Sequence, residues 1–224
     1  GARLLRAIAL LPGTPAIVRS ATVTVKGSGP LGPGAHAVPA AGGSVTPECL
    51  LALWVPGDTP VAYDSGPAFL LPANTDLILR VHYKKTWENE RLAMTDRSSV
   101  GLYFAPATAT EIRALAVSPQ ASQTLTEDLE VVAMYPDSAL ANVDVEVTAQ
   151  RPDGTRAELI RFRPQADWAR RYWFAEPVRL PRGTTSSSAA AFNDVLRPPG
   201  AAPFALKRSD PAAVRLTLNV IGGQ

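Results

Sequence analysis

Residues 143–154 read VDVEVTAQRPDG. Valines at 143, 145 and 147 alternate with acidic side chains, which is the two-residue period of an antiparallel strand with one buried face. Arg151–Gly154 is a turn sequence, because proline fixes φ and the following Asp-Gly permits a tight reversal. This stretch therefore predicts a strand that leads into a β-hairpin.

The rest of the chain repeats this pattern of short apolar runs separated by turn residues. The 21 prolines and 16 glycines favour short strands over long helices, and no stretch has a 3.6-residue period over three turns. We expect strands at Leu4–Leu11, Ile17–Val25, Cys49–Val55, Ala68–Leu71, Thr75–Tyr83, Val100–Phe104, Ile112–Val117, Leu129–Met134, Val143–Ala149, Ala157–Phe162, Arg171–Phe174, Thr184–Phe192 and Val214–Ile221.

The length and composition suit a globular all-β protein. Of the 224 residues, 46% are hydrophobic and 19% are charged, and a β-sandwich takes about 100 residues. We therefore predict two antiparallel, jelly-roll-like β-sandwich domains in tandem, at residues 1–106 and 107–224, joined near Pro106.

Charge, hydropathy and cysteine content exclude several functions. The net charge is +2 and the basic residues form no block, so we expect no nucleic-acid binding. Apolar runs such as Cys49–Val55 are too short to span a bilayer. The single cysteine permits neither an internal disulfide nor a thiolate zinc site. A start at Gly1 is compatible with removal of an upstream signal peptide or anchor.

One of the two histidines lies in the strand Thr75–Tyr83, which reads TDLILRVHY. Side-chain alternation puts Leu77, Leu79, Val81 and Tyr83 on one face and Ile78, Arg80 and His82 on the other. An imidazole in such an apolar strand is either a core residue or a group that once had partners.

The strings LRVHY at Leu79–Tyr83 and DRSSVGLYF at Asp96–Phe104 resemble the copper type II, ascorbate-dependent monooxygenases. This is the family of peptidylglycine α-hydroxylating and dopamine β-monooxygenase, and the likeness is to its bacterial homologues in particular. Further segments resemble the family in the same order: Arg3–Val18, Leu53–Gly57 with Leu71–Asp76, Arg151–Gly154 and Tyr172–Gly183. The likeness covers most of the chain and is weak from Arg197 onward. It implies two antiparallel sandwiches that carry one copper each.

The resemblance also implies where the copper ligands should lie. The family holds the first copper with a His-His pair and the histidine of the V-H-Y strand, and the second with His-x-His and a methionine. The strand histidine is His82, whereas the His-His pair falls on Arg19 and Ser20. The His-x-His falls on residues 137–139, which are Asp137, Ser138 and Ala139. Neither Met94 nor Met134 lies in the last strands, where the methionine is expected.

These replacements predict a pseudoenzyme. Arg19 is a permanent cation that repels a metal ion, and Ala139 has no donor atom. His82 alone does not hold a catalytic copper, since useful sites need about three protein ligands. We therefore expect no catalytic residue, no bound metal and no other cofactor, with His82 as a relic ligand.

Three other groups of residues are weaker candidates for sites. His36 in a loop is either an exposed side chain or a second-site ligand. Ser186–Ser188 with His82 and Asp194 would make a hydrolase triad, but no G-x-S-x-G elbow is present and the serines suit surface positions. Glu88, Glu90 and Asp96 match no known cation loop, and a local turn or ion pair of Asp96 with Arg97 is the simpler interpretation.

The tryptophans divide into core and interface candidates. Trp54 and Trp173 lie in apolar strands and are expected in the core. Trp87 and Trp168 lie in polar loops and are candidates for a protein interface. Arg170 and Arg171, with Arg161 and Arg163 nearby, form either a solvated face or a docking patch.

These features together predict a non-catalytic scaffold subunit that binds other proteins in a larger membrane-associated complex. Bacterial relatives often occur with cytochromes or membrane redox proteins, so the resemblance implies an extrinsic periplasmic subunit of an electron-transfer or photosynthetic complex. An upstream anchor or a partner protein would attach the protein to the membrane. Two alternatives stay open: a periplasmic binding module for a small molecule, peptide or glycan in an interdomain cleft, and a residual copper monooxygenase.

Overall fold

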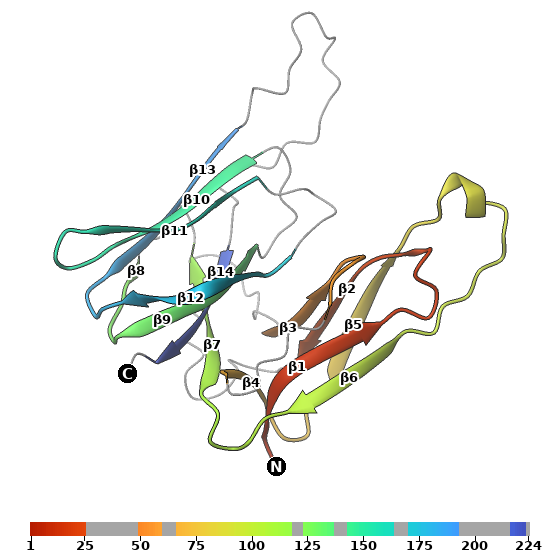
Figure 1. Ribbon diagram of the computed structural model, residues 1–224, viewed down its shortest axis with the longest axis horizontal. Coiled ribbons are helices and arrows are strands. Elements are labelled where there is room, and N and C mark those ends of the chain that lie inside the picture. The colour runs from red at the N-terminus through yellow and green to blue at the C-terminus, as the bar shows by residue number, and fades with distance from the viewer. Residues whose placement is uncertain are drawn as a thin grey trace, which may run out of the picture. The chain divides into compact units, whose positions relative to one another are not determined.

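The computed structural model describes residues 1–25, 49–59, 66–117, 123–136, 143–163, 170–192 and 216–222. Within these ranges the chain is all-β, and the only helical element is one 3-10 turn, η1 at Trp87–Asn89 (Figure 1). They hold no helix long and apolar enough to cross a membrane. The chain divides into two compact units, residues 1–114 and 115–224. The tandem arrangement of two sandwich domains, with a join near Pro106, stays a prediction.

Unit 1 contains two groups of paired strands. Its strands are β1 (Arg3–Leu11), β2 (Val18–Val25), β3 (Cys49–Trp54), β4 (Ala68–Leu71), β5 (Leu77–Tyr83), β6 (Ser99–Phe104) and the first part of β7 (Glu111–Val117). The strand order is β7-β4-β1-β6 in one sheet and β3-β2-β5 in the other. All these pairs are antiparallel except β4 with β7, which is parallel.

The core of unit 1 follows the alternation in its central strands. Val23 and Val25 of β2 are buried, as are Leu5 of β1 and Leu51 of β3. Val23 lies opposite Leu79 of β5, so the apolar face predicted for β5 continues the buried face of β2, but Leu79 itself is exposed.

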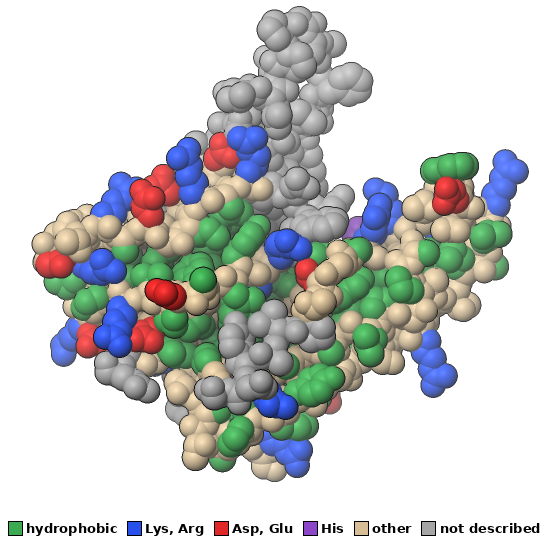
Figure 2. Space-filling model, in the orientation of Figure 1, with side chains coloured by type: hydrophobic (Ala, Val, Ile, Leu, Met, Phe, Trp, Pro, Cys, Tyr) green, Lys and Arg blue, Asp and Glu red, His purple; other side chains and the backbone are tan. Residues whose placement is uncertain are grey.

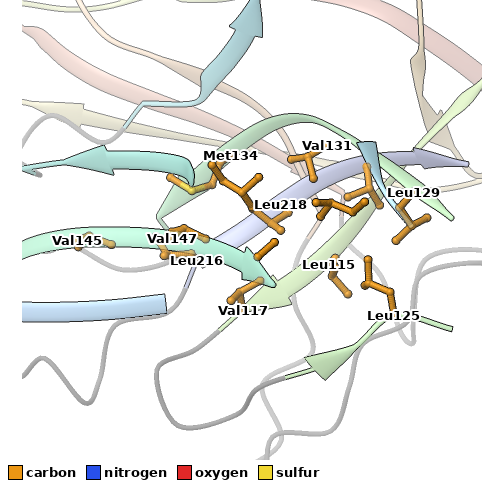
Figure 3. Close-up of a cluster of buried hydrophobic side chains, with 14 of the residues drawn as sticks. Leu115, Val117, Leu125, Leu129, Val131, Met134, Val145, Val147, Leu216 and Leu218 are labelled. Carbon is orange, nitrogen blue, oxygen red and sulfur yellow. The ribbon is translucent and has the colours of Figure 1, made fainter. Parts of the chain in front are cut away.

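Unit 2 likewise contains two groups of paired strands. Its strands are the last part of β7, followed by β8 (Gln123–Thr124), β9 (Leu129–Pro136), β10 (Val143–Gln150), β11 (Arg156–Phe162), β12 (Tyr172–Leu180), β13 (Thr185–Phe192) and β14 (Leu216–Gly222). The strand orders are β12-β9-β14 and β11-β10-β13-β8. Between them lies a cluster of buried apolar side chains, in which Val131, Met134 and Leu218 point toward one another (Figure 3).

The hairpin predicted from residues 143–154 is confirmed. Buried and half-buried residues alternate along β10, with Val143, Val145 and Val147 inside. Gly154 has φ of 84° and its N–H donates to the Arg151 carbonyl at 3.0 Å. Such a positive φ suits glycine, because it has no Cβ to clash with the backbone.

The structure corrects three details. Strand β12 continues past Phe174 to Leu180, because Pro177 lies at an irregularity in the pairing with β9 and β12 is terminal among the described strands. The two-residue strand β8 is too short to leave a pattern. Ser186 is buried rather than at the surface, because it lies opposite Ala149 on the inner face of β10.

Candidate interaction site at the β5–β6 loop

The residues assigned to the first copper site by resemblance lie on neighbouring strands. His82 of β5 is directly opposite Ser20 of β2, and an irregularity in the pairing falls at Arg19. His82 and Arg19 are exposed and Ser20 is half-buried. An imidazole, a hydroxyl and a guanidinium therefore lie together where β2 begins and β5 ends.

No clustered set of metal ligands is found in the described part of the chain. In these ranges no three or more His, Cys, Asp or Glu side chains come together in a way that could hold a metal ion. Residues 137–139, His36 and Asp194 lie outside the described residues. The second copper position and the triad of a serine with His82 and Asp194 therefore stay predictions.

The carboxylate of Asp96 holds the connection between β5 and β6 in place. Asp96 accepts hydrogen bonds from three segments of the chain, which include those from the Thr14 backbone N–H at 2.7 Å, the Tyr83 hydroxyl at 2.9 Å and the Ser98 hydroxyl at 2.7 Å. These donors come from the β1–β2 turn, the end of β5 and the residue before β6. Asp96 therefore fastens both ends of the β5–β6 loop, Lys84–Ser98, to the turn beside it.

Further contacts reinforce this attachment. The Thr14 hydroxyl donates to the Thr95 carbonyl at 2.7 Å, and the Lys84 N–H donates to the Ile17 carbonyl at 2.8 Å. Gly13 lies so close to the loop that a Cβ there would sit 2.5 Å from the Arg97 carbonyl oxygen. The turn and the loop are thus in backbone contact, and glycine is needed for this approach.

The hydrogen bonds shift two pKa values in opposite directions. The Ser98 hydroxyl, helped by Tyr83 and the Thr14 and Ser98 N–H groups, lowers the pKa of Asp96. The hydrogen bond to Asp96, with a smaller effect of burial, raises the pKa of Tyr83. Both shifts favour an ionised Asp96 beside a neutral Tyr83, which is the arrangement that holds the loop.

The loop carries a short turn with an exposed indole at its start. The η1 turn closes through N–H bonds from Asn89 to the Thr86 carbonyl and from Leu92 to the Asn89 carbonyl, at 3.0 and 3.1 Å. The Lys85 ammonium also donates to the Leu92 carbonyl. The side chain of Trp87 is 84% exposed and that of Leu92 is 54% exposed.

Exposed large apolar residues among the described ranges all lie in unit 1. Four of them form what we call the loop surface: Leu11, Tyr83, Trp87 and Leu92. Leu11 belongs to it because it pairs with Ser99, where the loop enters β6. Lys85, Glu88 and Arg91 are exposed beside them, and Figure 2 shows hydrophobic side chains interspersed with charged ones over unit 1.

The other predicted interface residues are placed differently. The Arg171 guanidinium is half-buried and lies over the rings of Tyr135 and Trp173, at 5.2 and 5.5 Å from their centroids. Arg170 is half-buried and Trp168 lies outside the described residues. Trp54 and Trp173, expected in the core, are both half-buried.

Sequence reasoning singled out Trp87 but missed what holds it in place. Thr14 and Asp96 are 82 positions apart, and no local pattern links them. Two signals were present: the loop is longer than most connections between strands, and Asp96 precedes Ser98 by two residues, a spacing at which an aspartate often accepts local hydrogen bonds.

No protein-family model matches the chain, and no curated protein is significantly similar to it. The resemblance to copper monooxygenases therefore depends on the quoted sequence segments and stays a prediction.

Proposed function

We propose that this protein is a non-catalytic interaction subunit, related to the copper monooxygenases, that binds another protein through the loop surface. The observation that carries the proposal is the exposed Trp87 indole on a loop held at both ends by Asp96. Tryptophan is enriched among residues that dominate the free energy of protein binding. An exposed indole on a tethered loop is the arrangement expected of such an anchor.

The tethering supports the proposal because it lowers the cost of association. Binding by a mobile loop loses conformational entropy, whereas a loop already in position loses less. The apolar side chains of Trp87 and Leu92 would form the centre of the interface. The charged side chains of Lys85, Glu88 and Arg91 would form its rim, which is the usual composition of a protein interface.

The absence of catalysis is proposed from the residues at the first copper position. Arg19 and Ser20 stand beside His82 where the family has imidazoles, and a guanidinium is a poor neighbour for a metal ion. Copper supplies the dioxygen chemistry in that family, and protein side chains do not replace it. By the same resemblance, the partner is expected to be a subunit of a membrane-associated electron-transfer complex in the bacterial periplasm.

The test is isolation of the tagged protein from its native source, followed by identification of what co-purifies. Trp87→Ala should lose a specific partner that the wild-type protein retains. Leu79→Ala is the matched control, because it removes another exposed large apolar side chain of unit 1 that belongs neither to the loop surface nor to β6. Retention of every partner by Trp87→Ala would refute the proposal for this surface.

The proposed absence of catalysis has a separate test. Metal analysis after purification with copper present should show copper far below full occupancy. Stoichiometric copper, with ascorbate-dependent oxygen consumption, would instead favour the residual monooxygenase.

A further inference from the structure

Among the described strands, β6 is an edge of its sheet. It pairs with β1 on one side and stands at the end of the order β7-β4-β1-β6. In the ranges that the structure describes, no strand pairs with its other side, and Figure 1 shows it as the outermost strand beside β1. Such an edge presents unpaired backbone N–H and C=O groups that can extend the sheet into another chain.

The sequence of β6 lacks the features that normally block an edge. Proteins protect edge strands with charged residues, proline or short length. The other terminal strands have them: Arg80 in β5, Glu158 in β11, Pro177 in β12, and only two residues in β8. The strand β6 reads SVGLYF, with no charge and no proline.

Exposure separates β6 from β3, the other uncharged terminal strand. The side chains described in β3 are all buried or half-buried, whereas Ser99, Tyr103 and Phe104 of β6 are exposed. Val100, Gly101 and Leu102 between them are half-buried. A six-residue edge segment without charge or proline and with exposed side chains at both ends is of the type that pairs with copies of itself. We infer that β6 pairs with β6 of a second copy of this chain, and that the two strands run antiparallel about a two-fold axis at Leu102.

The position of the axis follows from strand geometry. Residues directly opposite each other in an antiparallel pair point to the same face, and a two-fold axis perpendicular to the sheet preserves faces. Some residue must therefore oppose its own copy. An axis at Gly101 would place two glycines opposite each other and leave Phe104 beyond the paired segment. An axis at Tyr103 would shorten the overlap.

An axis at Leu102 gives complementary pairs throughout. Leu102 opposes its own copy, and Val100 opposes Phe104 of the second copy, an aromatic and β-branched pair of the kind that stabilises sheets. Gly101 opposes Tyr103 of the second copy. Because the Tyr103 ring already lies beside Gly101, the absence of a side chain there leaves room for both rings near the axis. No charge opposes its own copy anywhere along this pairing.

This self-association is independent of the proposed partner, because β6 and the loop surface are different parts of unit 1. Sedimentation of the purified chain should show a monomer–dimer equilibrium. Leu102→Lys and Leu102→Glu should each weaken the dimer by more than about tenfold, since like charges would face each other at the axis. An equimolar mixture of the two variants should dimerise again, which a folding defect could not produce.

Ser99→Lys is the matched control. It adds the same charge to the same strand, but Ser99 opposes Ala105 of the second copy and not itself, so the effect should be small. A chain that is monomeric at all concentrations would overturn the inference. Equal loss of dimer in Ser99→Lys and Leu102→Lys, or no recovery on mixing, would also overturn it.

The register has its own test in a Cys49→Ala background. Opposing residues place their Cβ atoms about 4.5–5.5 Å apart, so Leu102→Cys should link to its own copy through a short thiol-reactive crosslinker. Val100→Cys should not link to itself, but should link when mixed with Phe104→Cys. Efficient linkage of Val100→Cys alone would refute an axis at Leu102.

Discussion

Replacement of Gly13 by alanine is a direct test of the contact between the β1–β2 turn and the β5–β6 loop. The new Cβ would lie 2.5 Å from the Arg97 carbonyl oxygen and 2.8 Å from the Arg97 carbonyl carbon and nitrogen. These are backbone atoms, so no side-chain rotation relieves the overlap. Either the turn or the loop must move, although Thr14 holds them together through Asp96 and Thr95.

The magnitude and the sign both follow from this geometry. Added atoms in a packed site typically cost about 1–3 kcal/mol. Gly13 does not have a positive φ, so alanine also removes backbone freedom from the unfolded chain, which stabilises by about 0.4–1 kcal/mol. We therefore expect a net loss of roughly 1–2 kcal/mol in the free energy of unfolding. Without the close contact the substitution would be stabilising.

Urea denaturation followed by circular dichroism gives this free energy, and amide hydrogen exchange locates the change. Exchange should accelerate in residues 84–98 and in the turn. Gly222→Ala is the matched control, because a Cβ there meets nothing within 4 Å and the residue has no positive φ. A Gly13→Ala protein as stable as Gly222→Ala, with unchanged exchange in the loop, would refute the backbone contact.

Three further predictions test the hydrogen bonds of Asp96 and the core of unit 2. Asp96→Asn should lower the pKa of Tyr83 toward its ordinary value, as followed by NMR of labelled tyrosines; an unchanged pKa would contradict the hydrogen bond between them. The stability that Asp96 contributes is complete above the ordinary aspartate pKa of about 3.9. Because the pKa of Asp96 is lowered in the folded protein, this contribution should disappear as the pH falls through that lower value. Acidification should then speed up amide exchange in residues 84–98 of the wild type more than in Asp96→Asn, which has no carboxylate at this position to protonate. In unit 2, Leu218→Ala should cost about 2–5 kcal/mol in urea denaturation, and a loss below about 1 kcal/mol would argue against its complete burial.

Most strands of this protein were predictable because they depend on local pattern. The alternation of β10 and the turn at Arg151–Gly154 need only a few consecutive residues to be recognised, and both are confirmed. Where a local rule and the tertiary context disagreed, the rule failed. The strand predicted to end at Phe174 continues to Leu180, because a terminal strand tolerates Pro177 where its pairing is irregular.

The candidate site was less predictable because it depends on contacts between distant segments. The exposure of Trp87 could be inferred from its polar neighbours, and it is confirmed. The hydrogen bond from the Thr14 N–H to Asp96 could not be inferred from sequence, because it forms only when β1, β2, β5 and β6 are in place. Ser186 is a similar case: its small polar side chain suggests the surface, whereas its register opposite Ala149 puts it inside.

Strand β5 contains both the proposed relic copper ligand, His82, and Tyr83, which helps to hold the proposed binding loop. His82 and Tyr83 are consecutive, and consecutive side chains on a strand point to opposite faces. His82 lies opposite Ser20 of β2 in the strand register. Tyr83 donates a hydrogen bond to Asp96 and so helps to hold the loop that carries Trp87. Because the two residues do not share a face, substitutions around His82 can remove metal ligands without disturbing the hydrogen bonds of Tyr83. The proposed loss of a copper site at His82 is therefore compatible with the proposed binding loop, because the hydrogen bonds of the loop lie on the other face of β5.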